Sequence, residues 1–207
     1  MAEAAAANRL SPQTAKGRAT RQSILDAAEE VFGELSYDKA SIAEITRRAG
    51  VAQGTFYLYF PDKKSAFVEL VHQMNHDLRR MLSGAIAEAP DRLTAERIGL
   101  RTFFDYLIVH KSLYRIVREC QFVDPKTYQW HYGKLAKGYV RGIAEAQQRG
   151  EINNAMSADT IAWMLMGISE FLGGRWILWN DRVPPDDVFN EIMMFISCAL
   201  HPRGGSE

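Results

Sequence analysis

The sequence predicts an all-α protein of about nine helices. Apolar residues recur at helical spacing through most of the 207 residues. Serine, aspartate and glycine stand where helices of that spacing would begin and end. No stretch shows convincing strand-like alternation, and no tandem repeat is present. Apolar residues make up 47% of the chain, which is enough for a hydrophobic core.

Charge and cysteine content say little about partners. Lysine and arginine total 25, and so do aspartate and glutamate, so bulk charge does not indicate a polyanionic partner. Cys120 and Cys198 lie too far apart for a metal or redox motif, which favours a reducing compartment. Residues 1–19 lack the apolar core of a signal peptide and predict a disordered lead-in that becomes basic. We therefore expect a cytoplasmic protein.

Residues 20–66 predict a small three-helix domain. After a first helix, the second begins at Ser41, where a glutamate three residues later completes a capping box, and it ends at Gly50. The third helix is short and occupies residues 51–60, with the sequence VAQGTFYLYF. A helix, a glycine-containing turn and a short helix form the helix-turn-helix plan, in which the second of the two helices enters the DNA major groove.

The third helix divides its side chains between two roles. Phe56 and Phe60 are four residues apart, so both can face the first two helices. Gln53, Thr55 and Tyr59 fall nearer the outer face, where they can meet bases or phosphates. On spacing alone, a compact three-helix bundle without a DNA-binding role stays open.

Positive charge gathers around this helix. Between residues 39 and 64 there are five positive residues and two negative ones. Lys63 stands at the start of the next helix, where amide dipoles and an ammonium group together favour a phosphate. The local excess, unlike the bulk charge, is compatible with nucleic acid as a partner.

Residues 67–202 predict a helical bundle for ligand binding and dimerisation. One long helix continues from Lys63, a second begins at Asp91, and a third begins at Pro125 after the N-cap Asp124. The last two are expected over residues 157–180 and 186–200.

The helix over residues 157–180 is apolar on two faces, although a helix in a monomer of this size needs only one. We expect one face to pack inside the chain and the other against a second copy in a homodimer. A central helix enclosed by its own chain stays open, whereas Glu170 and Arg175 argue against a membrane span over residues 161–179. The residues predicted for the dimer interface are Ile168, Leu172, Trp176, Trp179, Phe189, Ile192, Phe195 and Ile196.

Residues 20–67 resemble the DNA-binding domain of the TetR (tetracycline-repressor type) transcriptional regulators. The similar stretches are ILDAAEEVF, SIAEITRRAGVAQGTFYLYF, and Lys63 followed by apolar Phe67. The resemblance implies binding of a double-stranded, palindromic operator by a dimer, with repression as the default. It implies that Thr55, Tyr59 and Lys63 contact the DNA backbone and that residues 52–55 provide much of the base contact. Tyr57 would mainly anchor the helix. The implied DNA-binding residues are Ser41, Ala52, Gln53, Gly54, Thr55, Tyr57, Tyr59 and Lys63.

Two positions depart from the family pattern. Ala52 stands where the family often has a capping serine, so we expect the recognition helix to lose a cap. Ser36 stands where the family usually has glycine after the first helix, so we expect that turn to be strained or differently shaped.

The resemblance also implies a cavity for a small-molecule effector in the C-terminal bundle, reached by the long helix that begins at Lys63. Large apolar and aromatic residues of this bundle suit such a site. Arg118, Glu119, Glu170 and Arg175 either pair with one another or leave an arginine for a carboxylate or phosphate. An aromatic acid, an acyl thioester and a neutral hydrophobic compound all fit. The predicted effector residues are Met74, Leu78, Phe104, Leu107, Arg118, Phe122, Tyr132, Trp163, Met166 and Glu170.

Other classes of protein have weaker support. There is no phosphate-binding glycine loop, metalloprotease motif or activated nucleophile, and we expect no catalytic residue, metal or cofactor. An all-α enzyme that uses Glu170 and His131 stays an alternative, as does an adaptor that grips a protein with the third helix. Catalysis would leave the basic and aromatic stretch over residues 50–64 without a role.

Overall fold

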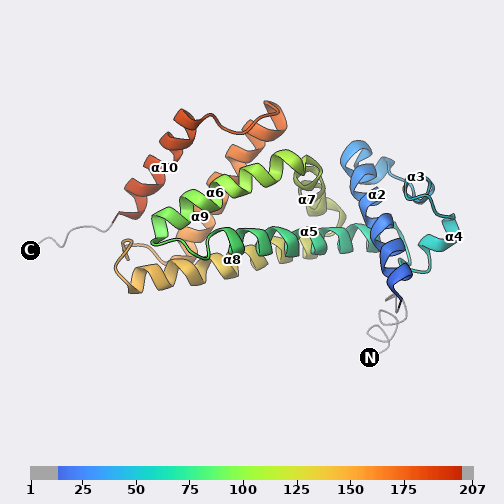
Figure 1. The fold of residues 1–207 in the computed structure, drawn as a ribbon, viewed down its shortest axis with the longest axis horizontal. Coiled ribbons are helices and arrows are strands. Elements are labelled where there is room, and N and C mark those ends of the chain that lie inside the picture. Colours follow the sequence, from blue (N-terminus) through green and yellow to red (C-terminus); the bar gives the residue numbers. More distant parts are fainter. Residues whose placement is uncertain (1–13, 202–207) are drawn as a thin grey trace, which may run out of the picture. The chain divides into compact units, whose positions relative to one another are not determined.

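The computed structural model describes residues 14–201, except for the side chain of Leu113. This part of the chain contains nine α-helices, one π-helical turn and no strand, as shown in Figure 1. The prediction of an all-α fold is therefore confirmed. The elements are α2 (Ala15–Lys39), α3 (Ile42–Arg48), α4 (Gln53–Phe56), α5 (Lys63–Ala85), α6 (Arg92–Val109), α7 (Lys111–Val123), α8 (Pro125–Gln148), α9 (Ala158–Gly173), η1 (Gly174–Trp179) and α10 (Asp186–Leu200).

Local sequence signals set most helix ends. Ser41 Oγ accepts a hydrogen bond of 3.1 Å from the Glu44 amide, and Gly50 adopts a left-handed φ of 68° after α3. Asp62 and Asp91 cap α5 and α6 through hydrogen bonds of 2.7 and 2.8 Å from amides three residues later. The helix starts predicted from these residues are confirmed.

Three boundaries differ from the sequence-based expectation. The third helix, expected over residues 51–60, is α-helical only over Gln53–Phe56. Residues 1–13 of the predicted lead-in lie outside the described residues, but Thr14 caps α2, so residues 15–19 are helical rather than disordered. The helix predicted over residues 157–180 changes character after Gly173, where the π-helical turn η1 replaces the α-helix. A π-helical turn bonds i to i+5, so it alters which residues share a face.

The chain divides into two compact units. Unit 1 comprises residues 14–74 and 112–129, and unit 2 comprises residues 75–111 and 130–201. This division differs from the sequence-predicted domain boundary at residue 66, because α7 packs with the N-terminal helices. The functional boundary stays a prediction.

In unit 1, α7 lies directly on α2. A Cβ atom at Gly33 would come within 2.7 Å of Ser112 Cβ, so the absence of a side chain at this position permits the close approach. Arg115 Nη1 donates to the Gly33 carbonyl at 2.9 Å, and Glu119 Oε2 accepts from the Tyr37 amide at 2.9 Å. Polar contacts therefore tie α7 to the second half of α2.

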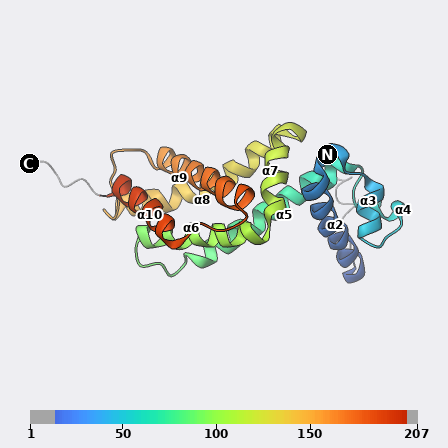
Figure 2. The same ribbon diagram turned by 90° about the horizontal axis from the view of Figure 1, so that it is seen from above.

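Unit 2 is built around α6. Arg101 lies 3.9 Å from the centre of the Phe189 ring of α10 and forms a 2.8 Å ion pair with Asp186. On the side toward α8, buried Arg92 pairs with Glu96, and Tyr139 donates to the same glutamate. The helices α6, α9 and α10 run beside one another in Figure 1 and Figure 2. Within residues 14–201, no helix has both the length and the apolar character needed to cross a membrane.

The backbone of α2 is interrupted at Ser36, which has φ 68° and ψ 160°. This region is almost restricted to glycine, because a Cβ atom there meets the neighbouring backbone, and occupying it costs about 1–3 kcal/mol. The expectation of a strained turn at Ser36 is therefore confirmed. The turn persists because the surrounding contacts of α5 and α7 hold it.

We expect Ser36→Gly to raise the free energy of unfolding by about 1 kcal/mol, because relief of the Cβ strain exceeds the added flexibility of the unfolded chain. Chemical denaturation followed by circular dichroism measures this change. Ser36→Ala is the matched control, since it keeps the Cβ atom and should bring no gain. Equal stabilisation by both variants would show that the strain is not the cause.

Candidate nucleic-acid interface and effector region

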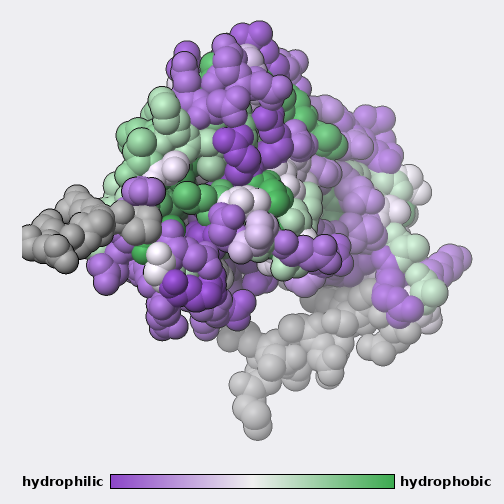
Figure 3. Space-filling view, turned by 60° about the vertical axis from the view of Figure 1, so that its left-hand side comes forward, coloured by the Kyte–Doolittle hydropathy of each residue, from purple (hydrophilic) through white to green (hydrophobic). Residues whose placement is uncertain are grey.

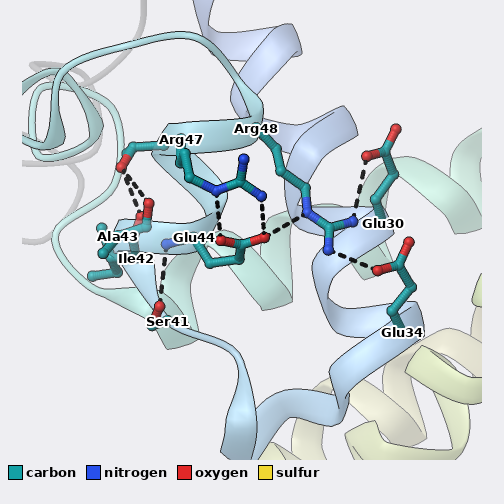
Figure 4. A network of polar contacts seen from close by, with 9 residues as sticks. Glu30, Glu34, Ser41, Ile42, Ala43, Glu44, Arg47 and Arg48 are labelled. Atoms are coloured by element: carbon teal, nitrogen blue, oxygen red, sulfur yellow. Dashed lines mark hydrogen bonds and ion pairs between the residues drawn. The ribbon is translucent and has the colours of Figure 1, made fainter.

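An ion-pair network holds α3 against α2, as Figure 4 shows. Arg48 reaches from α3 to Glu34 of α2 at 2.7 Å and to Glu30 at 3.7 Å. Within α3, Glu44 accepts from Arg47 at 2.7 Å and from Arg48 at 2.9 Å. The Glu44 carboxylate is therefore engaged by the arginines, and the hydrogen bond that Ser41 Oγ accepts from the Glu44 amide is the half of the predicted capping box that the structure shows.

The arginines also set the acidity of Glu44. Hydrogen bonds from Arg47 and then Arg48 lower the pKa of the Glu44 carboxyl from 4.5 to about 2. Arg48 likewise lowers the pKa of Glu34 through a side-chain hydrogen bond. Both carboxylates are ionised at neutral pH, so the network is intact there.

The short helix α4 presents polar side chains outward. Phe56 and Phe60 are buried with ring centres 5.5 Å apart, as the spacing predicted. Gln53 and Gly54 are exposed, and Tyr57 is half exposed with its ring edge-on to Phe56. Tyr57 therefore points outward more than its predicted anchoring role implies. Thr55 and Tyr59 are half-buried.

The N-terminus of α4 lacks a side-chain cap. Ala52 is the N-cap residue and, having no polar side chain, makes no capping hydrogen bond. The expected loss of a cap is confirmed. An exposed helix N-terminus without a cap leaves amide donors near the surface that carries Gln53.

Lys63 is held inside unit 1. Its ammonium donates to the carbonyls of Tyr37 at 2.7 Å and Ala40 at 2.9 Å, and it lies 4.3 Å from the centre of the Tyr37 ring. An ammonium has three N–H donors, so two are committed to the turn after α2. Asp62 meanwhile caps the N-terminus of α5 that was expected to favour a phosphate. The phosphate contact of Lys63 stays a prediction, and the structure gives this residue a structural role that the sequence did not reveal.

The predicted effector residues are distributed over both units. Met74, Arg118 and Phe122 belong to unit 1, and the other seven belong to unit 2. The residues of unit 2 fall into three groups by exposure. The buried ones are Leu78, Phe104 and Leu107, the half-buried ones are Tyr132, Met166 and Glu170, and Trp163 is half exposed.

Three of the predicted effector residues are too exposed to line an enclosed site. Phe122 is 84% exposed and Trp163 lies at the surface, so neither side chain lines an interior cavity in this structure. Arg118 is exposed as well. Glu119 accepts a hydrogen bond from the Tyr37 amide rather than pairing with Arg118. Helical periodicity placed these residues beside apolar neighbours but could not tell which neighbours other helices cover.

A buried polar cluster in unit 2 was missed as an effector candidate. Asn75 Nδ2 lies 3.2 Å from His131 Nδ1 and donates to the His131 carbonyl at 3.0 Å, while Arg79 Nε donates to Asn75 Oδ1 at 3.0 Å. Burial lowers the pKa of His131 to about 4. The imidazole is therefore neutral at physiological pH, with Nδ1 facing the Asn75 amide donor and the ring proton on Nε2.

The comparison that decides the family concerns the helix-turn-helix. Residues 24–70 match the family model of bacterial regulatory proteins of the tetR family. The chain carries a helix-turn-helix domain of the TetR family. It is a helix-turn-helix transcription regulator and not an enzyme.

Relatives extend over most of this TetR-family chain. It is 26% identical over 195 residues to the uncharacterized HTH-type transcriptional regulator YdgC of Bacillus subtilis (strain 168), covering 91% of this chain and 96% of that protein. It is 23% identical over 185 residues to the fatty acid metabolism regulator protein of the same organism, covering 87% and 95%. The crystal structure of FadR from Bacillus subtilis in complex with stearoyl-CoA shares the fold, with a TM-score of 0.78, 20% identity, and coverage of 87% of this chain and 99% of that one.

In this TetR-family regulator, α9 and α10 carry an apolar groove of about 430 Å³. On its surface Phe171 is 78% exposed and Phe195 is 63% exposed. The groove is lined by Ile168, Phe171, Leu172, Glu191, Ile192 and Phe195.

The predicted dimer residues do not all face outward. Trp176 is only 6% exposed, and Phe189, Ile192 and Ile196 are buried within their own chain, so these four side chains are largely covered without a partner, and the interface stays a prediction. Trp179 is 69% exposed. The π-helical turn explains Trp176, because the extra residue in that turn rotates it away from the face that Ile168 and Leu172 share. Phe171, which the prediction omitted, takes its place on the outer face.

We expect the Glu44 network to make stability depend on pH in the acidic range. The pKa of Glu44 in the folded protein, about 2, lies below the ordinary value of 4.5. The network therefore contributes fully above pH 4.5, and its contribution is lost as the pH falls toward about 2. Urea unfolding at a series of pH values should show a steeper acid loss in the wild type than in Glu44→Gln. High salt should narrow the difference, since the pairs are near the surface. Parallel stability curves for the two proteins would contradict this role.

Proposed function

We propose that this TetR-family chain is a repressor that binds a palindromic operator as a homodimer and is released by a mostly apolar small molecule, with a long-chain acyl thioester as the favoured effector class. The observation that carries the proposal is the outer face of α4 and of the turn after it, where Gln53 and Tyr57 stand exposed while Phe56 and Phe60 are buried beneath them.

DNA binding follows from this division of α4. A side-chain amide such as that of Gln53 can pair with an adenine edge in the major groove. The uncapped amides at the start of α4 suit a phosphate, and Tyr57 can reach the DNA backbone with its hydroxyl. The Arg48 network supports recognition indirectly, because it fixes α3 on α2 in the domain that carries α4.

Homodimerisation is supported by the groove on α9 and α10. A second copy is the occupant we propose, because the lining residues come from the two last helices and leave large apolar side chains exposed. Figure 3 shows such hydrophobic surface, in green, among hydrophilic residues on the face that it presents. In a two-fold dimer the groove of one copy packs against the same groove of the other. The two recognition helices of such a dimer can then bind half-sites about one helical turn apart, roughly 34–36 Å.

The effector class is supported by two comparisons and by composition. The solved FadR neighbour is in complex with stearoyl-CoA, and one relative is a fatty acid metabolism regulator. In this chain, Leu78, Phe104 and Leu107 supply a buried apolar interior to unit 2. An acyl chain matches such an interior, since ligand sites are mostly apolar with a few polar groups.

Effector binding in unit 2 can be coupled to the helix-turn-helix through two helices, α5 and α7. The helix α5 is continuous over 23 residues from Lys63, which holds the turn after α2, to Ala85 in unit 2. The helix α7 follows α6 along the chain and contacts α2 through Arg115 and Glu119. A rearrangement of either helix would therefore change its contacts with the helix-turn-helix. A hundredfold release from DNA requires a coupling free energy of about 2.7 kcal/mol.

We expect the protein to bind an operator, selected from a random duplex library, with an affinity that falls steeply with salt. Gln53→Ala should reduce discrimination between operator and random duplex roughly tenfold or more while leaving the salt slope unchanged, because base contacts carry the sequence information. Fluorescence anisotropy measures both quantities, and addition of stearoyl-CoA should release the duplex. Gln129→Ala, at an exposed glutamine outside α4, is the control. Absence of any duplex preference would refute the DNA-binding role.

We expect Phe171→Asp combined with Phe195→Asp to convert a dimer into a folded monomer, because a charge on the outer face is tolerated by the monomer and not by an apolar interface. Sedimentation velocity measures the change, and circular dichroism checks the fold. Phe122→Asp is the matched control, since this phenylalanine is equally exposed but lies outside α9 and α10. A dimer that survives the double substitution would place the interface elsewhere.

A further inference from the structure

The indole of Trp176 is buried without a hydrogen-bond acceptor. Within the described part of the chain, its Nε1 is the buried side-chain nitrogen or oxygen that has no partner, and the side chain is 6% exposed. Burial of a donor without an acceptor is costly, and such groups are rare enough in folded proteins to require an explanation. An aliphatic or phenylalanine side chain would fill a similar space without that cost.

The backbone at this tryptophan is also unusual. Trp176 lies in η1, and π-helical turns are rare and occur frequently at functional sites. The Arg182 amide donates to the Trp176 carbonyl at 3.1 Å, which fixes the loop after η1 against the turn. This contact brings a second arginine next to the one that precedes Trp176 in the sequence.

Both arginines lie by the same indole ring. The guanidinium carbons of Arg175 and Arg182 are 5.4 and 5.1 Å from the ring centre. Both side chains are exposed, and among residues 14–201 neither forms an ion pair. The nearby carboxylate of Asp181 pairs with Lys111 instead. Two guanidinium groups and one unsatisfied donor therefore gather in one place with no anion to neutralise them.

We propose that Trp176, Arg175 and Arg182 form a subsite for the anionic head group of the effector, a carboxylate or a phosphate. The proposal rests on the proposed function, which it deepens by assigning the polar end of the ligand. One anionic oxygen accepts from Trp176 Nε1, and the guanidinium groups lift from the ring and close on the remaining oxygens. Exposed arginine side chains can move in this way without opening the core, and guanidinium geometry suits both carboxylate and phosphate.

The subsite predicts that the effector is an amphiphile, with an apolar chain and an anionic head group. A neutral hydrocarbon or alcohol offers no charge to the two arginines, so it should bind unit 2 more weakly than an acid with the same chain. The location on η1 also places the head group at the end of α9, the helix whose outer face carries part of the apolar groove.

Indole resonances test the subsite even while the effector is unidentified. The chain has four tryptophans, so protein labelled with ¹⁵N at the indole nitrogen should give four indole signals, and Trp176→Phe identifies one of them. We expect acetate and inorganic phosphate, titrated separately at constant ionic strength, to move the Trp176 indole proton downfield in a saturable way. Trp179, which is 69% exposed and three residues further along, is the internal control and should not respond.

Substitution of the arginines tests the charge. Arg175→Gln combined with Arg182→Gln should weaken the binding of the responding anion about tenfold or more, because charge-assisted hydrogen bonds are lost. Arg141→Gln removes an exposed positive charge elsewhere in unit 2 and should have no effect. Titration of the wild type with stearate, stearoyl-CoA and stearyl alcohol then distinguishes carboxylate, phosphate and neutral head groups.

The outcomes separate this inference from the proposed function. An unmoved Trp176 signal, an equal response of Trp179, or a shift that follows protein concentration instead of anion concentration would overturn the subsite; the last result would assign the acceptor to a second copy. If stearoyl-CoA releases operator from the wild type and the double variant alike, the subsite fails and the proposed function stands. If the wild type shows no duplex preference at all, the proposed function itself fails.

Discussion

The turn that follows α2 is the point on which the organisation of unit 1 depends. Its carbonyls at Tyr37 and Ala40 receive the ammonium of Lys63 from α5, and the Tyr37 amide is taken by Glu119 of α7. A helix end leaves such groups unpaired unless a side chain satisfies them. The partners here come from two later helices, so the same contacts that complete α2 also fix α5 and α7 in place.

This arrangement accounts for the strain at Ser36. A left-handed, extended conformation at a serine is unfavourable in isolation and persists only where the surroundings determine it. The hydrogen bonds with Lys63 and Glu119 hold the backbone next to Ser36 in this conformation. The strained residue thus lies at the contacts that the end of α2 makes with α5 and α7.

Charge is used differently in the two units. In unit 1, Arg48 holds α3 on α2 and Glu44 accepts from Arg47 and Arg48 within α3, whereas Gln53 and Gly54 of α4 are exposed. In unit 2, Arg92 and Glu96 are likewise engaged with each other, and Tyr139 donates to the same glutamate. Arg175 and Arg182 differ from both groups, because they face an aromatic ring and the nearby carboxylate of Asp181 pairs with Lys111. A ligand with an anionic head group would supply a carboxylate or phosphate to these two guanidinium groups, as the proposed subsite requires.

Capping residues and i, i+4 spacing act over a few residues, so they were enough to predict the all-α class, most helix starts, and the burial of Phe56 and Phe60. The sequence also identified Ser36 and Ala52 as local departures from the family pattern. The position of Trp176 could not be predicted in this way, since the π-helical turn changes the phase of a helix that is apolar on both faces. The same holds for Lys63, Glu119 and Phe122, whose partners or exposure depend on helices far away in the sequence. Periodicity states which residues share a face, but the neighbouring helix decides whether that face is covered.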